Sequence, residues 1–183
     1  MLATFQARAE AVSAEVRRCA SPAEAVEQVL ALLRAEGVAD RPGQRAVWAN
    51  SPVLAGRDRA ALAAQVPGLS FEVTRDAAAE AKVGVSQMDH GVAATGSLAQ
   101  AAHEVAQRLV STLPELHVAL LDPARIVPDL AALLARIGPG ETRYLSLITG
   151  PSRTADIERV LTIGVHGPKR LVILLVDDLN GRV

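Results

Sequence analysis

Short apolar runs alternate with longer amphipathic stretches along most of this chain. Four apolar segments have the length of a strand and turn residues close by: Ala46–Ala49, Lys82–Ser86, Leu116–Leu121 and Leu171–Val176. Apolar runs of this length are typical of strands in a buried sheet. Because helix-length segments separate them, the pattern predicts an α/β fold.

The N-terminal part of the chain predicts two helices. Residues 4–18 place charged side chains among alanines, which favours a first helix. Ser21, Pro22 and Glu24 then form a capping-box pattern, in which the serine caps a helix and the glutamate reaches back. This second helix is expected to end near Gly37.

The length of 183 residues favours one domain, because a chain of this size can bury about 70% of its unfolded surface. We therefore expect a single domain over residues 1–183. The N-terminal helices, about residues 1–37, are expected to pack on this domain or to extend from it.

The segment around residues 148–168 has the most informative pattern. Tyr144–Ile148 predicts a strand, Leu171–Val176 predicts another, and a helix-sized stretch lies between them. A strand–helix–strand unit requires a parallel pair with a right-handed crossover. Both strands are therefore expected in one central, mainly parallel sheet. The helix would begin at the carboxyl edge of that sheet, where ligands bind in open parallel sheets.

Polar residues gather at the predicted start of this helix. Free backbone N–H groups and the positive end of the helix dipole favour an anion there, and a guanidinium would add a bidentate grip. Equally, the hydroxyls could only cap the helix while the arginine pairs with an acid. The residues alone leave both interpretations open. The candidate ligand-binding residues of this turn are Thr149, Gly150, Ser152, Arg153, Thr154 and Asp156.

Two further places are candidates for the same site. In Thr95-Gly96-Ser97 two hydroxyls flank a glycine, which would let a backbone approach a bound anion closely; a plain turn or bulge is the alternative. His166 lies in the loop that leads to the last strand, where a structural role is as consistent with the sequence as a catalytic one.

Composition excludes several classes of function. The net charge of −1 and the four aromatic residues argue against nucleic-acid binding. Cys19 is the single cysteine, so four thiolates of this chain cannot hold an iron–sulfur cluster. His103-Glu104-Val-Ala-Gln107 lacks the second histidine of a zinc motif, and no metal site is expected. The chain has no signal-peptide pattern and no apolar run of about 20 residues, so a cytoplasmic protein without a membrane span is expected.

The amino-acid sequences of three segments resemble motifs of one known family. Gly150-Pro-Ser-Arg-Thr-Ala-Asp-Ile-Glu158, followed by Gly164-Val-His-Gly-Pro168, closely resembles the closing motif of the lactate-utilisation (LUD-domain) family, in its protein C branch. Asp89–Leu98 resembles an earlier motif, with Ser97 in place of the usual threonine. Leu113-Pro-Glu-Leu-His117, then Ile126-Val-Pro128, resembles a third.

This resemblance implies a sharper architecture and a function. The family's fold is a three-layer α/β sandwich with a mainly parallel central sheet, shared with glucosamine-phosphate deaminases, ribose-phosphate isomerases and CoA transferases. The implied function is that of a subunit in a system that oxidises L-lactate to pyruvate. Such a subunit would bind a small carboxylate or phosphate ligand, hold no cofactor itself and act with separate iron–sulfur proteins; a homo-oligomer is left open.

An alternative from another class is a stand-alone enzyme on the same fold, such as a sugar-phosphate isomerase, a CoA transferase or a folate cyclo-ligase. Lys82 and Lys169 are the only lysines, and no basic ATP loop is present, which disfavours the cyclo-ligase. No glutamate lies in a motif that supports a transferase nucleophile. Because the chain has no cysteine set for a cluster and no dinucleotide-binding fingerprint, the subunit is expected not to oxidise lactate alone.

Overall fold

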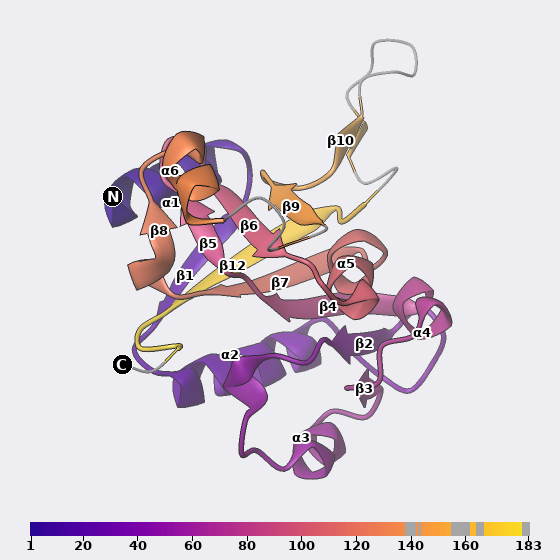
Figure 1. The fold of residues 1–183 in the computed structure, drawn as a ribbon. Helices are drawn as coiled ribbons and strands as arrows, with labels where there is room; N and C mark the ends of the chain where they lie inside the picture. Colours follow the sequence, from indigo (N-terminus) through magenta and orange to yellow (C-terminus); the bar gives the residue numbers. More distant parts are fainter. Residues whose placement is uncertain (138–141, 143, 155–161, 164–166, 181–183) are drawn as a thin grey trace.

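The computed structural model describes residues 1–137, 142, 144–154, 162–163 and 167–180. Its main element is a six-stranded sheet in which every neighbouring pair is parallel. A smaller, mixed sheet of four strands lies over one end of it (Figure 1). The chain is thus an α/β protein with a six-stranded all-parallel sheet and a small mixed sheet.

The strand order of the parallel sheet is β1 (Glu15–Cys19), β12 (Arg170–Val176), β7 (Leu116–Leu121), β4 (Ala81–Gln87), β2 (Arg45–Trp48) and β3 (Leu69–Ser70). The order of the mixed sheet is β8 (Ile126–Val127), β5 (His90–Val92), β6 (Ser97–Ala101) and β9 (Leu145–Ile148). The helices are α1 (Leu2–Ala11), α2 (Pro22–Ala35), α3 (Arg59–Gln65), α4 (Arg75–Ala79), α5 (Val105–Thr112) and α6 (Leu130–Arg136), with 3₁₀ turns η1 (Pro52–Leu54) and η2 (Pro123–Arg125).

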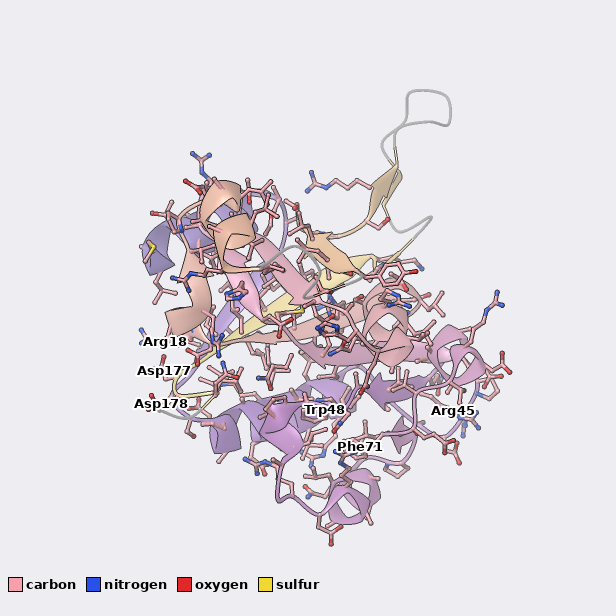
Figure 2. The ribbon with its side chains drawn as sticks, viewed as in Figure 1. Arg18, Arg45, Trp48, Phe71, Asp177 and Asp178 are labelled. Carbon is pink, nitrogen blue, oxygen red and sulfur yellow. The ribbon has the colours of Figure 1, made fainter. Side chains whose placement is uncertain are left out.

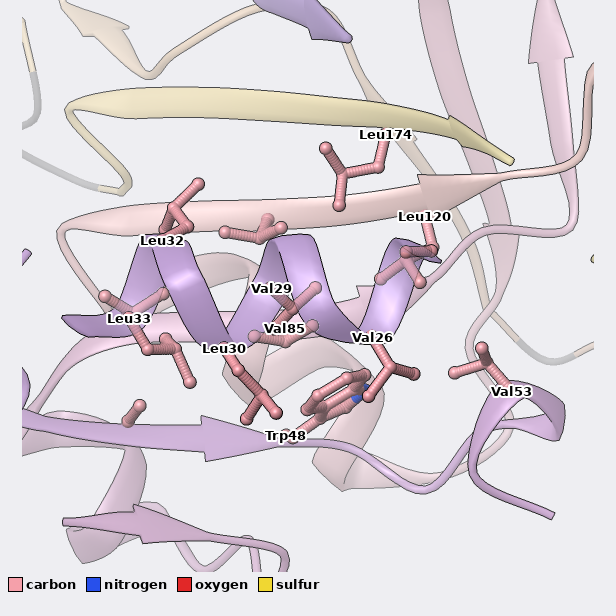
Figure 3. Packing of buried hydrophobic residues seen from close by; sticks show 14 of the residues in the cluster. Val26, Val29, Leu30, Leu32, Leu33, Trp48, Val53, Val85, Leu120 and Leu174 are labelled. Carbon is pink, nitrogen blue, oxygen red and sulfur yellow. The ribbon is translucent and has the colours of Figure 1, made fainter. Parts of the chain in front are cut away.

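One face of the parallel sheet is covered by α2, whose start at Ser21 the capping pattern predicted. The Ser21 hydroxyl accepts from the Glu24 N–H at 3.2 Å, and the Glu24 carboxylate accepts from the Ala20 N–H at 2.7 Å. Figure 3 shows the apolar side of this helix against the sheet, where it packs with Trp48 and Leu120. Trp48 also stacks on Phe71 with ring centroids 5.9 Å apart (Figure 2).

The other face of the sheet is shared between two sets of elements. At the β2–β4 end, α4 and α5 pack on Val47 and Ala81. At the β7–β12 end, α1 and the mixed sheet pack on Leu121 and Ile173. None of the described helices is long and apolar enough to cross a membrane.

The prediction of one helix over residues 4–18 is wrong in its second half. The helix α1 ends at Ala11, and Glu15–Cys19 is strand β1 at the edge of the parallel sheet. An edge strand exposes much of one side, so Arg17 and Arg18 are tolerated in it and hide its strand pattern. Arg18 pairs with Asp177 at 3.1 Å (Figure 2).

The predicted strand–helix–strand unit is also wrong. The strand β9 forms as predicted, but it pairs antiparallel with β6 in the mixed sheet and is not a neighbour of β12. Arg153–Thr154 is a short strand, β10, antiparallel to β11 (Thr162–Ile163), so no helix begins there. A four-residue apolar strand has the same pattern in either kind of sheet, and its partner depends on the rest of the fold.

Candidate ligand site at the amino edge of the sheet

The predicted turn borders a cavity of about 340 Å³. The loop that follows β9 forms one wall of this cavity, through Thr149, Gly150, Ser152 and Arg153. The amino ends of two central strands form the floor, through His117, the second residue of β7, and Leu171, the second residue of β12, which are paired in register. The cavity therefore lies at the amino edge of the parallel sheet. The prediction that this turn occupies the carboxyl edge is wrong, because β9 does not belong to that sheet.

Hydrogen bonds join the two predicted motifs directly. The Ser97 hydroxyl lies 2.7 Å from the Thr95 hydroxyl and 2.7 Å from the Thr149 hydroxyl. Antiparallel pairing of β6 with β9 brings residues 97 and 149 together, since Leu98 is paired with Ile148. The expected proximity of Thr95–Ser97 to Gly150 is thus confirmed, although the expected sheet arrangement is not.

The two glycines of these motifs are explained by packing against the end of α1. Gly96 has φ +66°, and a Cβ there would lie 2.2 Å from the backbone nitrogen of Ala9. Gly150 has φ +70°, and a Cβ there would lie 2.3 Å from the backbone oxygen of Val12. Both positions require a left-handed backbone and no side chain. In the structure both glycines let their turns approach the backbone at the end of α1, a role that the expected alternatives at Thr95–Ser97, ligand contact or a plain turn or bulge, did not include.

Arg153 is exposed and holds the same part of the chain. Its guanidinium donates to the backbone oxygen of Val12 at 3.0 Å and to the hydroxyl of Ser13 at 2.7 Å. The Ser152 N–H donates to the Pro168 oxygen at 2.9 Å. No helix of the described residues begins at this turn, and one of the amides expected to be free is already bonded, so the described turn offers no cradle of amides at a helix start. The carboxyl end of α5, at Ser111 and Thr112, borders the cavity instead. Of the predicted turn, the structure keeps Thr149, Gly150 and Ser152 together with the Arg153 guanidinium at the cavity wall.

Three polar residues of this cavity were not predicted from the sequence: Ser111, Thr112 and His117. Of these, His117 is the one with a buried ring nitrogen that no described residue uses. It is fully buried, and its Nε2 lies 2.8 Å from the Ser86 hydroxyl. Its Nδ1 has no hydrogen-bond partner among the described residues. Burial lowers the pKa of His117 to about 4, so the ring is neutral at physiological pH. The available signal was its place in the Leu113–His117 motif, whereas its apolar neighbours in the strand favoured a core residue.

Two of the predicted residues, Asp156 and His166, lie outside the described residues, and the side chain of Thr154 is not described. Within the described part of the chain, no three histidine, cysteine, aspartate or glutamate side chains form a group that could hold a metal ion.

Comparison with known proteins adds the family. Residues 2–176 match the family model of the LUD domain. The chain is 35% identical over 114 residues to lactate utilization protein C of Exiguobacterium sp. AT1b, covering 59% of this chain and 50% of that protein. It is 36% identical over 107 residues to lactate utilization protein C of Bacillus velezensis, covering 55% and 44%. The chain spans about half the length of these curated relatives.

A solved structure supports the fold. The crystal structure of a DUF162 family protein from Deinococcus radiodurans superimposes with a TM-score of 0.58. The two chains are 20% identical, and the match covers 96% of this chain and 95% of the other. At this identity the likeness shows a common fold.

Proposed function

Because this chain belongs to the LUD domain family, we propose that it is a subunit of a system that oxidises L-lactate to pyruvate. Relatives named lactate utilization protein C support this assignment. The oxidation removes two electrons from lactate. The chain has one cysteine, Cys19, and so cannot supply four thiolates for a cluster. The proposal therefore includes iron–sulfur clusters on separate partner proteins as electron acceptors.

We propose further that a small carboxylate binds in the amino-edge cavity. The observation that carries this proposal is the convergence of Thr149, Ser152, Arg153 and His117 on one cavity. Its volume of about 340 Å³ is ample for a three-carbon acid. A carboxylate needs a cation, and Arg153 is the charged residue among those described in the cavity wall. Neutral His117 adds a ring nitrogen that has no hydrogen-bond partner in the described part of the chain.

Titration calorimetry with L-lactate, D-lactate, pyruvate and inorganic phosphate tests this site. We expect binding of at least one carboxylate, weakened by about 1–3 kcal/mol in Arg153→Gln, the usual loss for a hydrogen bond to a charged group. Arg17→Gln is the matched control, because Arg17 lies on β1 and does not border the cavity.

Arg153 also holds Val12 and Ser13, so the unfolding curve of each variant is recorded beside its affinity. A parent chain that binds none of the four anions would refute the proposed site. Equal affinity in Arg153→Gln and the parent would remove the arginine from it.

The finer architecture is part of the proposal. Helices and the mixed sheet cover both faces of the parallel sheet, which supports a three-layer sandwich of the deaminase, isomerase and CoA transferase fold group. A cytoplasmic location belongs to the same proposal.

A further inference from the structure

Two further cavities lie at the opposite, carboxyl edge of the parallel sheet. The larger, of about 440 Å³, is bordered by the loop after β2 and the start of α5; the smaller, of about 230 Å³, by the loops after β2, β4 and β12. Asn50, Ser51, Pro52 and Gln107 border both cavities. In open parallel sheets this edge is where ligands usually bind.

Ser51 carries a hydroxyl that no described residue uses as a hydrogen-bond partner. It precedes Pro52 at the start of η1, a position where a serine side chain normally caps the turn, yet it makes no cap bond. The Val53 N–H donates instead to the Gln87 side-chain oxygen at 3.1 Å, and the Leu54 N–H to the Ser51 backbone oxygen at 3.0 Å. Ser51 is 7% exposed, and its Oγ has no hydrogen-bond partner in the described part of the chain.

A buried hydroxyl without a hydrogen-bond partner lowers the stability of the folded protein. A ligand that hydrogen-bonds to this hydroxyl would explain why a serine occupies the position. Replacement of the serine by alanine would remove that cost in the empty protein. The two effects, on stability and on binding, therefore have opposite signs for a ligand-binding hydroxyl.

A chain of side-chain hydrogen bonds fixes the wall around Ser51. The Gln87 amide nitrogen donates to the Asn180 side-chain oxygen at 2.8 Å. The Asn180 amide nitrogen donates to the Asp122 carboxylate at 3.1 Å, which also accepts from the Ala124 N–H at 2.9 Å. These bonds tie together the segments that follow β4, β7 and β12. The site is thus preorganised by groups that are themselves satisfied.

Each cavity is bordered by one arginine and one carboxylate, Glu104 at the larger and Asp89 at the smaller, and the arginines are the groups that can receive an anion. Arg59 borders the larger cavity and Arg125 the smaller, and no ion pair joins either guanidinium to an acid of the described residues. The Arg59 guanidinium donates to the neutral Asn50 side chain at 2.5 Å. Asp89, in contrast, is engaged, because its carboxylate accepts from the Ala101 N–H at 2.7 Å.

We propose that the smaller cavity at the carboxyl edge, which both Ser51 and Arg125 border, binds a small hydroxylated anion. A hydroxyl of the ligand would bond to Ser51, and the charged group of the ligand would pair with Arg125. Hydroxylated phosphate monoesters and hydroxylated carboxylic acids share this chemistry. The site is separate from the amino-edge cavity, so its test does not depend on the proposed role in lactate oxidation.

Binding is measured by titration calorimetry with glycerol 3-phosphate, glycerate and uncharged glycerol, each to 10 mM. We expect saturable binding of at least one of the two anions and none of glycerol. Binding of only one anion identifies the charged group as phosphate or carboxylate. Ser51→Ala and Arg125→Gln should each weaken binding at least tenfold.

Thermal unfolding without ligand separates this role from a structural one. Ser51→Ala should unfold at the same temperature as the parent or higher. The matched control Ser21→Ala removes a hydroxyl that does cap a helix, and it should unfold at a lower temperature with unchanged anion affinity. The proposal is overturned if neither anion binds the parent, if Ser51→Ala binds as the parent does, or if Ser51→Ala loses stability as Ser21→Ala does.

Discussion

Gly96→Ala tests the packing of α1 against the mixed sheet. Gly96 has φ +66°, and the added Cβ would lie 2.2 Å from the Ala9 nitrogen and 2.6 Å from the Arg8 carbonyl carbon. Real Cβ contacts are not this short, and backbone atoms cannot rotate away as the tip of a side chain can. Either the end of α1 or the turn between β5 and β6 has to move.

The expected loss follows from three contributions. An alanine in the left-handed region costs roughly 1–2 kcal/mol. The lower entropy of the unfolded chain offsets about 0.4–1 kcal/mol of that. Overpacking of a closely packed site adds about 1–3 kcal/mol. The free energy of unfolding should therefore fall by about 1–5 kcal/mol, most of it from the contact with α1.

Gly56→Ala is the matched control. Gly56 has φ +69°, almost the same as Gly96, and an added Cβ would meet no atom within 4 Å. This variant carries the backbone contribution alone, for an expected loss of about 0–2 kcal/mol. The difference between the two variants isolates the steric contribution.

Urea unfolding of the parent, Gly96→Ala and Gly56→Ala, followed by far-ultraviolet circular dichroism, measures these losses. The slope with urea should be unchanged, which would show that the unfolded state is not altered. If Gly96→Ala loses no more than Gly56→Ala, within about 0.5 kcal/mol, α1 does not pack rigidly on this turn and the explanation of Gly96 fails.

Other expectations concern the buried histidine, the helix cap and the isolated subunit. His117 stays neutral in the folded chain down to a pKa of about 4, while in the unfolded chain it takes up a proton below about pH 6.5. The unfolded state then binds more protons, so the free energy of unfolding should fall by up to about 3 kcal/mol as pH drops from 6.5 to 4. Urea titrations of His117→Gln should show a smaller fall, and equal falls in both proteins would contradict the assignment. Ser21→Ala should lower the free energy of unfolding by about 1 kcal/mol, because the Glu24 N–H loses its acceptor; an unchanged urea midpoint would show that the cap is dispensable. The purified chain should be colourless and should not reduce a dye with L-lactate, whereas co-expression with its genomic neighbours should yield an active assembly. Lactate-dependent dye reduction by the chain alone would instead support the stand-alone enzyme.

Local sequence determined most of the strands and helices. Leu116–Leu121 is predicted and observed with the same bounds, because a buried parallel strand needs only a continuous apolar run between turn residues. Four adjacent residues, 21–24, were enough to predict the cap at Ser21 and the start of helix α2. Such elements are set by interactions within a few positions along the chain, which a sequence pattern records directly.

The tertiary structure decided which strands became neighbours. The run at 145–148 has the composition of a strand, but its pairing with β6 depends on a contact between residues about 50 positions apart. This pairing placed the 149–153 turn at the amino edge. Another long-range contact, the pairing of β1 with β12, brought β1 into the parallel sheet despite Arg17 and Arg18.

Both candidate sites depend on that choice for a common physical reason. The Thr95–Ser97 and 149–153 motifs were selected from the sequence, yet His117 became visible only when burial left Nδ1 without a partner. Ser51 was not selected at all, because its free hydroxyl results from the Gln87 side chain taking over its cap. Sequence specifies which polar groups a chain carries. Only the folded structure shows which of them the fold satisfies and which it leaves for a ligand, since the partners come from distant parts of the chain.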